Sequence, residues 1–267
     1  MTQPDFQATA DLLRDTLRLK TLPLSVSFLD NPEAFDAKTR RPSADLGKRI
    51  TFCQAVTMAR LYGWSVGLTR KDLVCVPAML AFGFSDAASP ADRLGRLFCE
   101  VDFARSEENG VAEVETMYRL NNGEYPAILI KPLGRGEVVP DVVAVYANPA
   151  QIMRMVQAIV YVTGVRIVGS FGGKVECTEY LLAPFRTREP RVAIPGMGDR
   201  IFSMTQDDEM VLSLPAEGLP ALASGLENAG RSIGARYPVT HYQGFEPVFP
   251  PAYGRLADEL GLFAESD

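Results

Sequence analysis

Cys177 has the position in this sequence best suited to chemistry. It follows a glycine pair, in Gly172-Gly173-Lys174-Val175-Glu176-Cys177, where a helix is expected to begin after a loop. Cys53 has a similar place, near the expected start of another helix. Free backbone N–H groups and the positive end of the helix dipole point there, so a thiolate is favoured over a thiol. A thiolate serves both metal ligation and nucleophilic attack, and the positions alone do not name the reaction.

The remaining cysteines, Cys75 and Cys99, complete a set of four with no CxxC pair. Scattered cysteines in a reducing compartment are expected to be thiols or ligands rather than a disulfide framework. Cys99 fits a core position on a helix, and a core role is the ordinary alternative for each cysteine taken alone. If the fold brings Cys53, Cys75 and Cys177 together, they would form a thiolate cluster suited to an iron–sulfur centre or another soft metal.

Two glycine-bearing loops are candidates for a small-molecule pocket. Gly172 and Gly173 lie between an expected strand and a helix, where backbone N–H groups can hold a carboxylate or phosphate. The loop lacks the GxGxxG spacing, so it does not predict a nucleotide site, and a turn that merely packs helix on strand is the alternative. Gly196 and Gly198 form a second turn, followed by Arg200. Arg200 either makes a bidentate contact to an anionic ligand or pairs with Asp199 or the surface.

Composition excludes several classes of protein. The 267 residues are 47% hydrophobic and 22% charged, with a formal charge of −6. An acidic chain without a Lys/Arg cluster is a poor partner for nucleic acid. No run approaches the roughly 18 apolar residues of a membrane span, and the N-terminus lacks the apolar core of a signal peptide. We therefore expect a cytoplasmic protein with no membrane partner, and the apolar content leaves a homo-oligomer open.

The elements that must position these residues alternate between strands and helices. A first helix is expected over residues 6–19, a strand over 24–29 and a long loop over 30–48. Other expected elements include a strand over 141–146, a helix over 150–163, a strand over 165–168, a hairpin of 201–205 with 209–214, and a final helix over 253–263. The strand–helix–strand order favours a parallel pair joined by a crossover. We expect one α/β or α+β domain over residues 1–267, with a mixed sheet and at least one such crossover. Helices, including the first and the last, are expected to pack on this sheet.

The order and spacing of several short segments resemble the DUF169 family, a domain of unknown function common in archaea and anaerobic bacteria. The resemblance runs from about Leu22 to Leu226 and rests on Leu22-Pro23-Leu24, Phe52-Cys53-Gln54-Ala55 with Ala59-Arg60, Cys75 with Phe82-Gly83-Phe84, Pro140-Asp141-Val142-Val143 with Asn148-Pro149-Ala150-Gln151, Gly172-Gly173 with Glu176-Cys177-Thr178, and Gly198-Asp199-Arg200. It carries no established activity. It implies that Cys53, Cys75 and Cys177 stand where the family's cysteines tend to fall, whereas Cys99 does not.

The leading hypothesis is therefore a protein that binds a metal centre or small cofactor through Cys53, Cys75 and Cys177, with the glycine loops lining the same pocket. The first alternative is a thiol-dependent enzyme in which Cys177 is a nucleophile activated by its helix dipole. The second is a metal-free module that binds a small molecule or a protein and uses its cysteines only as core.

Overall fold

The fold is built around one antiparallel sheet. A computed structural model describes residues 5–86, 89–241 and 250–262 of the chain. Within these ranges the sheet has six strands in the order β2-β3-β1-β4-β6-β5, and all neighbours are antiparallel. The strands are β1 (Leu24–Leu29), β2 (Val66–Thr69), β3 (Ala127–Pro132), β4 (Val142–Ala147), β5 (Arg191–Ala193) and β6 (Met210–Pro215).

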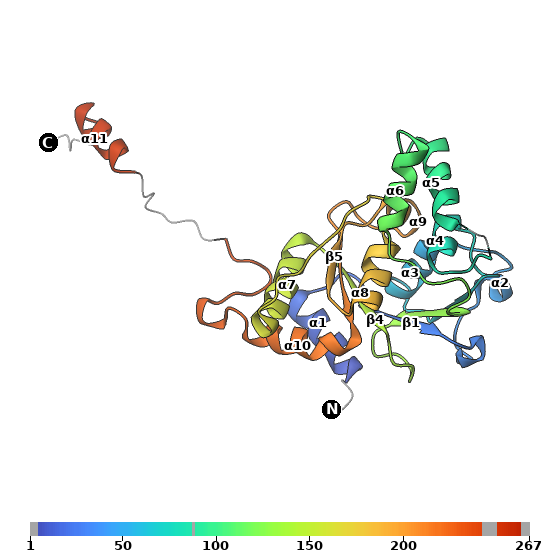
Figure 1. Cartoon of the computed structure of the whole chain (residues 1–267). Helices are drawn as coiled ribbons and strands as arrows, with labels where there is room; N and C mark the ends of the chain where they lie inside the picture. The colour runs from blue at the N-terminus through green and yellow to red at the C-terminus, as the bar shows by residue number, and fades with distance from the viewer. Residues whose placement is uncertain (1–4, 87–88, 242–249, 263–267) are drawn as a thin grey trace.

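Helices cover both faces of this sheet, which is buried on each side (Figure 1). Successive residues of a strand point to opposite faces, and β4 illustrates this: Val142, Ala144 and Tyr146 belong to one core, Val143 and Val145 to the other. The helices in the described ranges are α1 (Phe6–Leu17), α2 (Pro42–Asp45), α3 (Phe52–Arg60), α4 (Val76–Ala81), α5 (Pro90–Glu100), α6 (Glu107–Thr116), α7 (Pro149–Thr163), α8 (Ala183–Thr187), α9 (Met197–Phe202), α10 (Leu219–Asn228) and α11 (Pro251–Glu259).

The two cores differ in their helices. The first core takes side chains from α3, α4 and the π-helical turn Thr178–Leu182, and the second from α1, α7 and α10. We call them the first and second layers. The predicted N-terminal helix is confirmed as α1, whose Leu13 and Leu17 are fully buried in the second layer.

Helix α7 begins and ends where its local signals require. The Asn148 side chain accepts from the N–H of Gln151, and the Gln151 side chain accepts from the N–H of Asn148, which forms a capping box. Gly164 ends the helix with a φ of +69°, a conformation that glycine adopts without a Cβ penalty. Gln151 also donates to the carbonyl of Leu17, so the start of α7 is fixed to the end of α1.

The α/β class with helices packed on a sheet is confirmed, but the adjacent parallel pair is not formed. Residues 165–168 are not a strand and make only one parallel bridge, between Val168 and Arg191. The position beside β4 is taken by β6, which pairs antiparallel with both β4 and β5. The expected mixed sheet is therefore wrong, since every described strand pair is antiparallel; β4 and β5 run in the same direction only because β6 lies between them.

Three further segments differ in detail from the sequence predictions. The expected hairpin of residues 201–205 with 209–214 is absent, because α9 occupies residues up to Phe202 and β6 pairs with β4 and β5 instead. The expected loop over 30–48 contains the 3-10 turn Pro32–Ala34 and the short helix α2. The expected C-terminal helix is present as α11 (Figure 1). Its Tyr253 and Leu256 are exposed, and its packing on the sheet stays a prediction.

Helices α5 and α6 form a hairpin whose backbones touch. A Cβ added to Gly95 would lie 2.5 Å from the nitrogen of Val111, and one added to Gly110 would lie 2.2 Å from the carbonyl oxygen of Gly95. Only glycine permits so close an approach. The hairpin encloses a small core of its own, built on Leu94, Phe98 and Val114. Across the described ranges, no helix is long and apolar enough to cross a membrane.

Candidate functional site

The three cysteines singled out by sequence all lie at the beginning of helical segments. Cys53 is the second residue of α3, whose N-cap Thr51 forms a capping box with Gln54. Cys75 is the N-cap of α4, and Cys177 directly precedes the π-helical turn. The expected helix-start positions of Cys53 and Cys177 are therefore confirmed.

These three thiols, which are far apart in sequence, influence one another electrostatically. Negative charge on Cys75 and on Cys177 raises the pKa of Cys53, and Cys75 also raises the pKa of Cys177. Such effects between single groups act over short range. Cys177 is buried, whereas Cys53 and Cys75 are partly exposed. In the described part of the chain, however, no three His, Cys, Asp or Glu side chains are close enough to hold a metal ion.

The expectation that these cysteines are thiolates is wrong for the conformation described. Burial raises the pKa of Cys53, Cys75 and Cys177 above the ordinary thiol value, and the Asp199 carboxylate raises all three further. Loss of hydration therefore outweighs the favourable field of a helix N-terminus. The sulfurs are protonated unless a positive charge compensates them.

Asp199 is the centre of the polar part of the site. Its side chain is buried, and Oδ1 accepts hydrogen bonds from the hydroxyls of Tyr146 at 3.3 Å and Tyr180 at 3.2 Å. The Cys53 thiol also donates to Asp199, and the Gly196 N–H donates to Oδ2 at 3.3 Å. Burial nevertheless raises the pKa of Asp199 above its usual range, although these hydrogen bonds oppose the shift.

The glycine loop binds a carboxylate that belongs to the protein itself. The N–H groups of Gly172 and Gly173 both donate to Oε1 of Glu176, and Glu176 is only 1% exposed. Its Oε2 has no hydrogen-bond partner among the described residues. Burial raises the pKa of Glu176 to about 7, because the two N–H donors compensate the lost hydration only in part. Both N–H groups expected to hold a ligand are therefore used by Glu176, and binding of an external group by Gly172 and Gly173 stays a prediction.

The second glycine turn lies against both the first loop and a thiol. A Cβ on Gly196 would lie 3.0 Å from Cγ of Glu176, and a Cβ on Gly198 would lie 3.6 Å from Sγ of Cys53. The N–H of Met197 donates to the carbonyl of Gly173 at 3.0 Å. The two loops predicted to line one pocket are therefore adjacent to each other, to Cys53 and to the residue beside Cys177.

Arg200 is engaged within its own turn region. It donates to the carbonyl of Gln206 at 2.7 Å and lies 3.9 Å from Asp207. A contact from Arg200 to an anionic ligand stays a prediction. Cys99 lies on α5 and is partly exposed.

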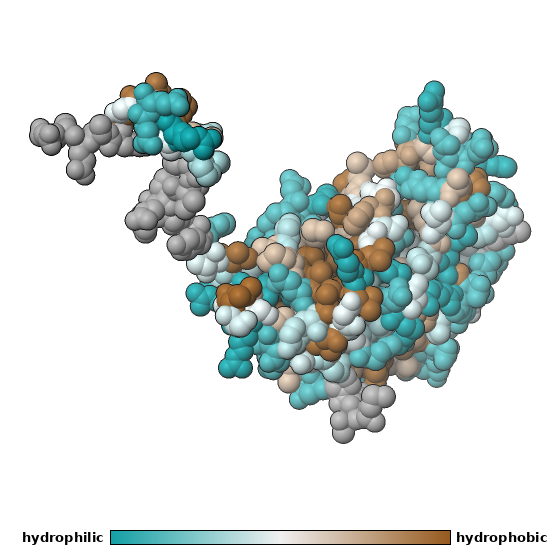
Figure 2. Space-filling model, turned by 60° about the vertical axis from the view of Figure 1, so that its left-hand side comes forward, coloured by the Kyte–Doolittle hydropathy of each residue, from teal (hydrophilic) through white to brown (hydrophobic). Residues whose placement is uncertain are grey.

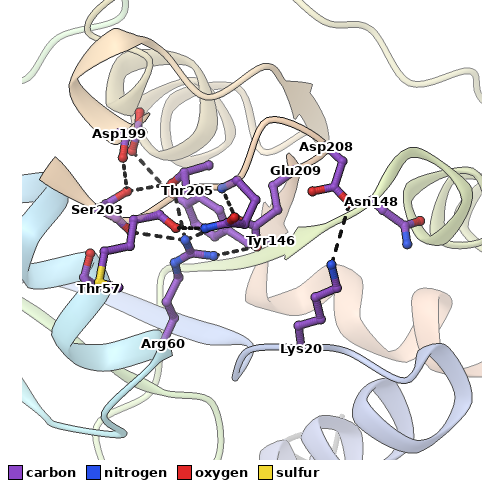
Figure 3. Close-up of polar contacts among 12 residues, drawn as sticks. Lys20, Thr57, Arg60, Tyr146, Asn148, Asp199, Ser203, Thr205, Asp208 and Glu209 are labelled. Atoms are coloured by element: carbon purple, nitrogen blue, oxygen red, sulfur yellow. Dashed lines mark hydrogen bonds and ion pairs between the residues drawn. The ribbon is translucent and has the colours of Figure 1, made fainter. Parts of the chain in front are cut away.

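Behind Asp199 lies a buried ion pair that sequence reasoning missed (Figure 3). Arg60 is 1% exposed and bonds Glu209 at 2.8 Å, while its guanidinium lies 4.3 Å from the centre of the Tyr146 ring. It also donates to the carbonyl of Ser203, whose hydroxyl donates to the carbonyl of Asp199 at 2.6 Å. A lone arginine on an apolar helix, three residues after Thr57, was the available signal. Its partner Glu209 is 149 residues away in sequence.

The fold and the site define an antiparallel α/β protein with a buried cluster of thiols, carboxyls and tyrosines beside two glycine turns. Comparison with known protein families gives a more specific assignment. The chain belongs to the DUF169 family, described as "Uncharacterised ArCR", whose model matches residues 12–225. It is also 25% identical over 178 residues to the uncharacterized protein MJ0308 of Methanocaldococcus jannaschii, which covers 66% of this chain and 76% of the relative. No solved structure matches it.

Proposed function

We propose that this protein binds a soft-metal centre, with an iron–sulfur cluster as the leading candidate, through Cys53, Cys75 and Cys177. The observation that carries the proposal is the place of three thiols from separate segments in the first layer. Cys177 belongs to its core, Cys75 packs against that core, and Cys53 lies against Gly198 in the turn that carries the buried Asp199.

The protonation of the free thiols is compatible with this role. Burial raises the pKa of the thiols by removing hydration, and the positive charge of a bound metal offsets this loss. The sulfurs therefore lose their protons on binding. A single ion with metal–sulfur bonds of about 2.3 Å needs its donors closer together than the described conformation has them. A cluster of several metal atoms gives each thiolate its own metal, which favours the iron–sulfur candidate over a mononuclear site. Three protein ligands leave a coordination position for a small molecule near the glycine turns.

A reducing compartment, which we propose to be the cytoplasm, keeps such thiols available. The other hypotheses have less support. A nucleophilic Cys177 would have to react although its side chain is 5% exposed and its pKa is raised. A purely structural role leaves Asp199 and Glu176 beside the thiols without explanation.

The test is anaerobic purification followed by reconstitution with ferrous iron and sulfide, read by metal and sulfide analysis and by the visible absorption spectrum. We expect iron and sulfide to be retained by the parent and by Cys99→Ser, the matched control. Cys53→Ser, Cys75→Ser and Cys177→Ser should each lower retention. A colourless, metal-free protein after reconstitution, or equal retention in all four variants, contradicts the proposal.

A further inference from the structure

A cavity separate from the cysteine site opens at the end of α7. It has a volume of about 390 Å³ and is bounded by α7, the segment that follows it, the residues leading into β5, the end of β6 and the start of α10. Volumes of about 300–1,000 Å³ are typical of sites for small organic molecules. None of the residues of the cysteine site described above lines this cavity.

The wall of the cavity is aliphatic, and part of it is exposed to solvent. Ile159 and Leu214 contribute from α7 and β6, and Val165, Ile167 and Val168 from the segment that fails to form a strand. Val165 is 67% exposed and Val168 is 64% exposed, which are high values for valines. Figure 2 shows hydrophobic residues gathered in the middle of one face of the molecule, with hydrophilic residues around them. No aromatic side chain is among the described residues that line the cavity.

Charged residues line the same cavity, with a positive balance. Three arginines and two glutamates line it, giving a net charge of +1 in a chain whose formal charge is −6. Arg188 bonds Glu217, and Arg191 bonds Glu189 at 3.2 Å. Arg166 has no hydrogen-bond or ion-pair partner among the residues that the structure describes. One guanidinium is therefore free to bind a singly charged group, and its planar fork matches a carboxylate.

We infer that this cavity binds a small aliphatic carboxylate, with the hydrocarbon body against the valine, isoleucine and leucine side chains and the carboxylate on Arg166. The aliphatic wall provides burial for the body, and the free guanidinium selects the head group. The site is independent of the proposed metal centre, because it shares no residue with it.

The test is a calorimetric titration of the full chain with octanoate and, in parallel, with 1-octanol, which has the same body without the charge. We expect octanoate to bind and 1-octanol to bind more weakly. Arg166→Ala should weaken octanoate binding about tenfold, the loss typical of one charge-assisted hydrogen-bonded contact. Arg105→Ala removes the same charge from an exposed position outside the cavity and should leave binding unchanged.

A second variant tests the cavity itself. Ala221→Phe places a large side chain into its lining and should abolish octanoate binding, provided that the far-ultraviolet circular dichroism spectrum stays that of the parent. Since Arg166 is exposed, Arg166→Ala remains a valid test even where Ala221→Phe does not fold. Absence of octanoate binding to the parent, equal binding of octanoate and 1-octanol, or undiminished binding to Arg166→Ala overturns the inference.

Discussion

The two layers on either side of the sheet are made from the same strands but contain different chemistry. The second layer, between the sheet and α1, α7 and α10, has a mainly aliphatic core, and α7 also buries Gln151 and Arg154, which bond backbone carbonyls. The first layer holds, beside its apolar core, the buried ion pair of Arg60 and Glu209, the buried carboxyls of Glu176 and Asp199, and three thiols. Burying polar groups costs stability unless they are paired, so the buried carboxyls beside the three thiols make the first layer the candidate site. The second layer supports that arrangement by packing.

The largest effect should come from breaking the buried ion pair of the first layer. Arg60→Ala leaves the carboxylate of Glu209 buried without its partner, and we expect a loss of about 3–5 kcal/mol in the free energy of unfolding. Chemical denaturation measures this loss. The double variant Arg60→Met with Glu209→Leu removes both charges and should recover most of it. A single variant as stable as the parent would show that the pair is dispensable.

A cavity in the second layer should cost nearly as much stability but leave the site intact. Met155 is fully buried there, so Met155→Ala should lower the free energy of unfolding by about 2–5 kcal/mol. The rate at which the thiols react with a disulfide reagent should not change, because Met155 packs on the opposite face of the sheet from the cysteines. Altered thiol reactivity in a folded Met155→Ala protein would mean that the two layers are not independent.

A smaller, pH-dependent effect is expected at Asp72, whose side chain is completely buried. Burial raises the pKa of Asp72, but hydrogen bonds from Ser43 and Thr69 outweigh it, and the net pKa is lowered. Its contribution is therefore fully present above the unfolded value of about 4 and is lost as the pH falls through the lower folded value. Asp72→Asn should cost about 2 kcal/mol at neutral pH.

Denaturation of Asp72→Asn and the parent at a series of pH values checks this expectation. The difference in stability should shrink as the pH falls below about 4. A difference that stays constant with pH would mean that the carboxylate charge is not involved.

The smallest effect should come from an exposed pair. Arg70 and Asp86 lie 2.7 Å apart with side chains 60% and 88% exposed. Arg70→Gln should change the free energy of unfolding by no more than about 0.5 kcal/mol, because water screens the pair. A loss comparable to that of Arg60→Ala would contradict the view that burial decides the strength of these ion pairs.

Local signals predicted the elements that have strong local determinants. Helix α7 has a capping box at Asn148 and a terminal glycine at Gly164, and both are visible in the sequence. The segment 165–168 shows the limit of such signals. Its residues suit a strand, but β6 occupies the position beside β4, and the segment meets the sheet only at one bridge, from Val168 to Arg191 of the edge strand β5. Which strands become neighbours depends on the whole chain rather than on any one segment.

The sequence likewise predicted only part of the candidate site. The positions of Cys53 and Cys177 at helix starts followed from neighbouring residues. Their protonation did not, because burial depends on what the fold packs around a thiol. The sequence suggests Asp199 only as a pairing partner for Arg200, and the packing of its turn against Tyr146 and Tyr180 makes it a buried acceptor instead.

The direct contact between the backbones of α5 and α6 has a mechanical consequence. At the contact of Gly95 with Gly110 the two backbones leave no room for a side chain, and Leu94, Phe98 and Val114 pack beside it. Lys174, the residue after the glycine pair, bonds Glu113 of α6 at 2.7 Å and lies over the ring of Phe98 of α5. Lys174 therefore ties the close-packed hairpin to the loop that holds Glu176, so the hairpin restrains the segment that leads to Cys177.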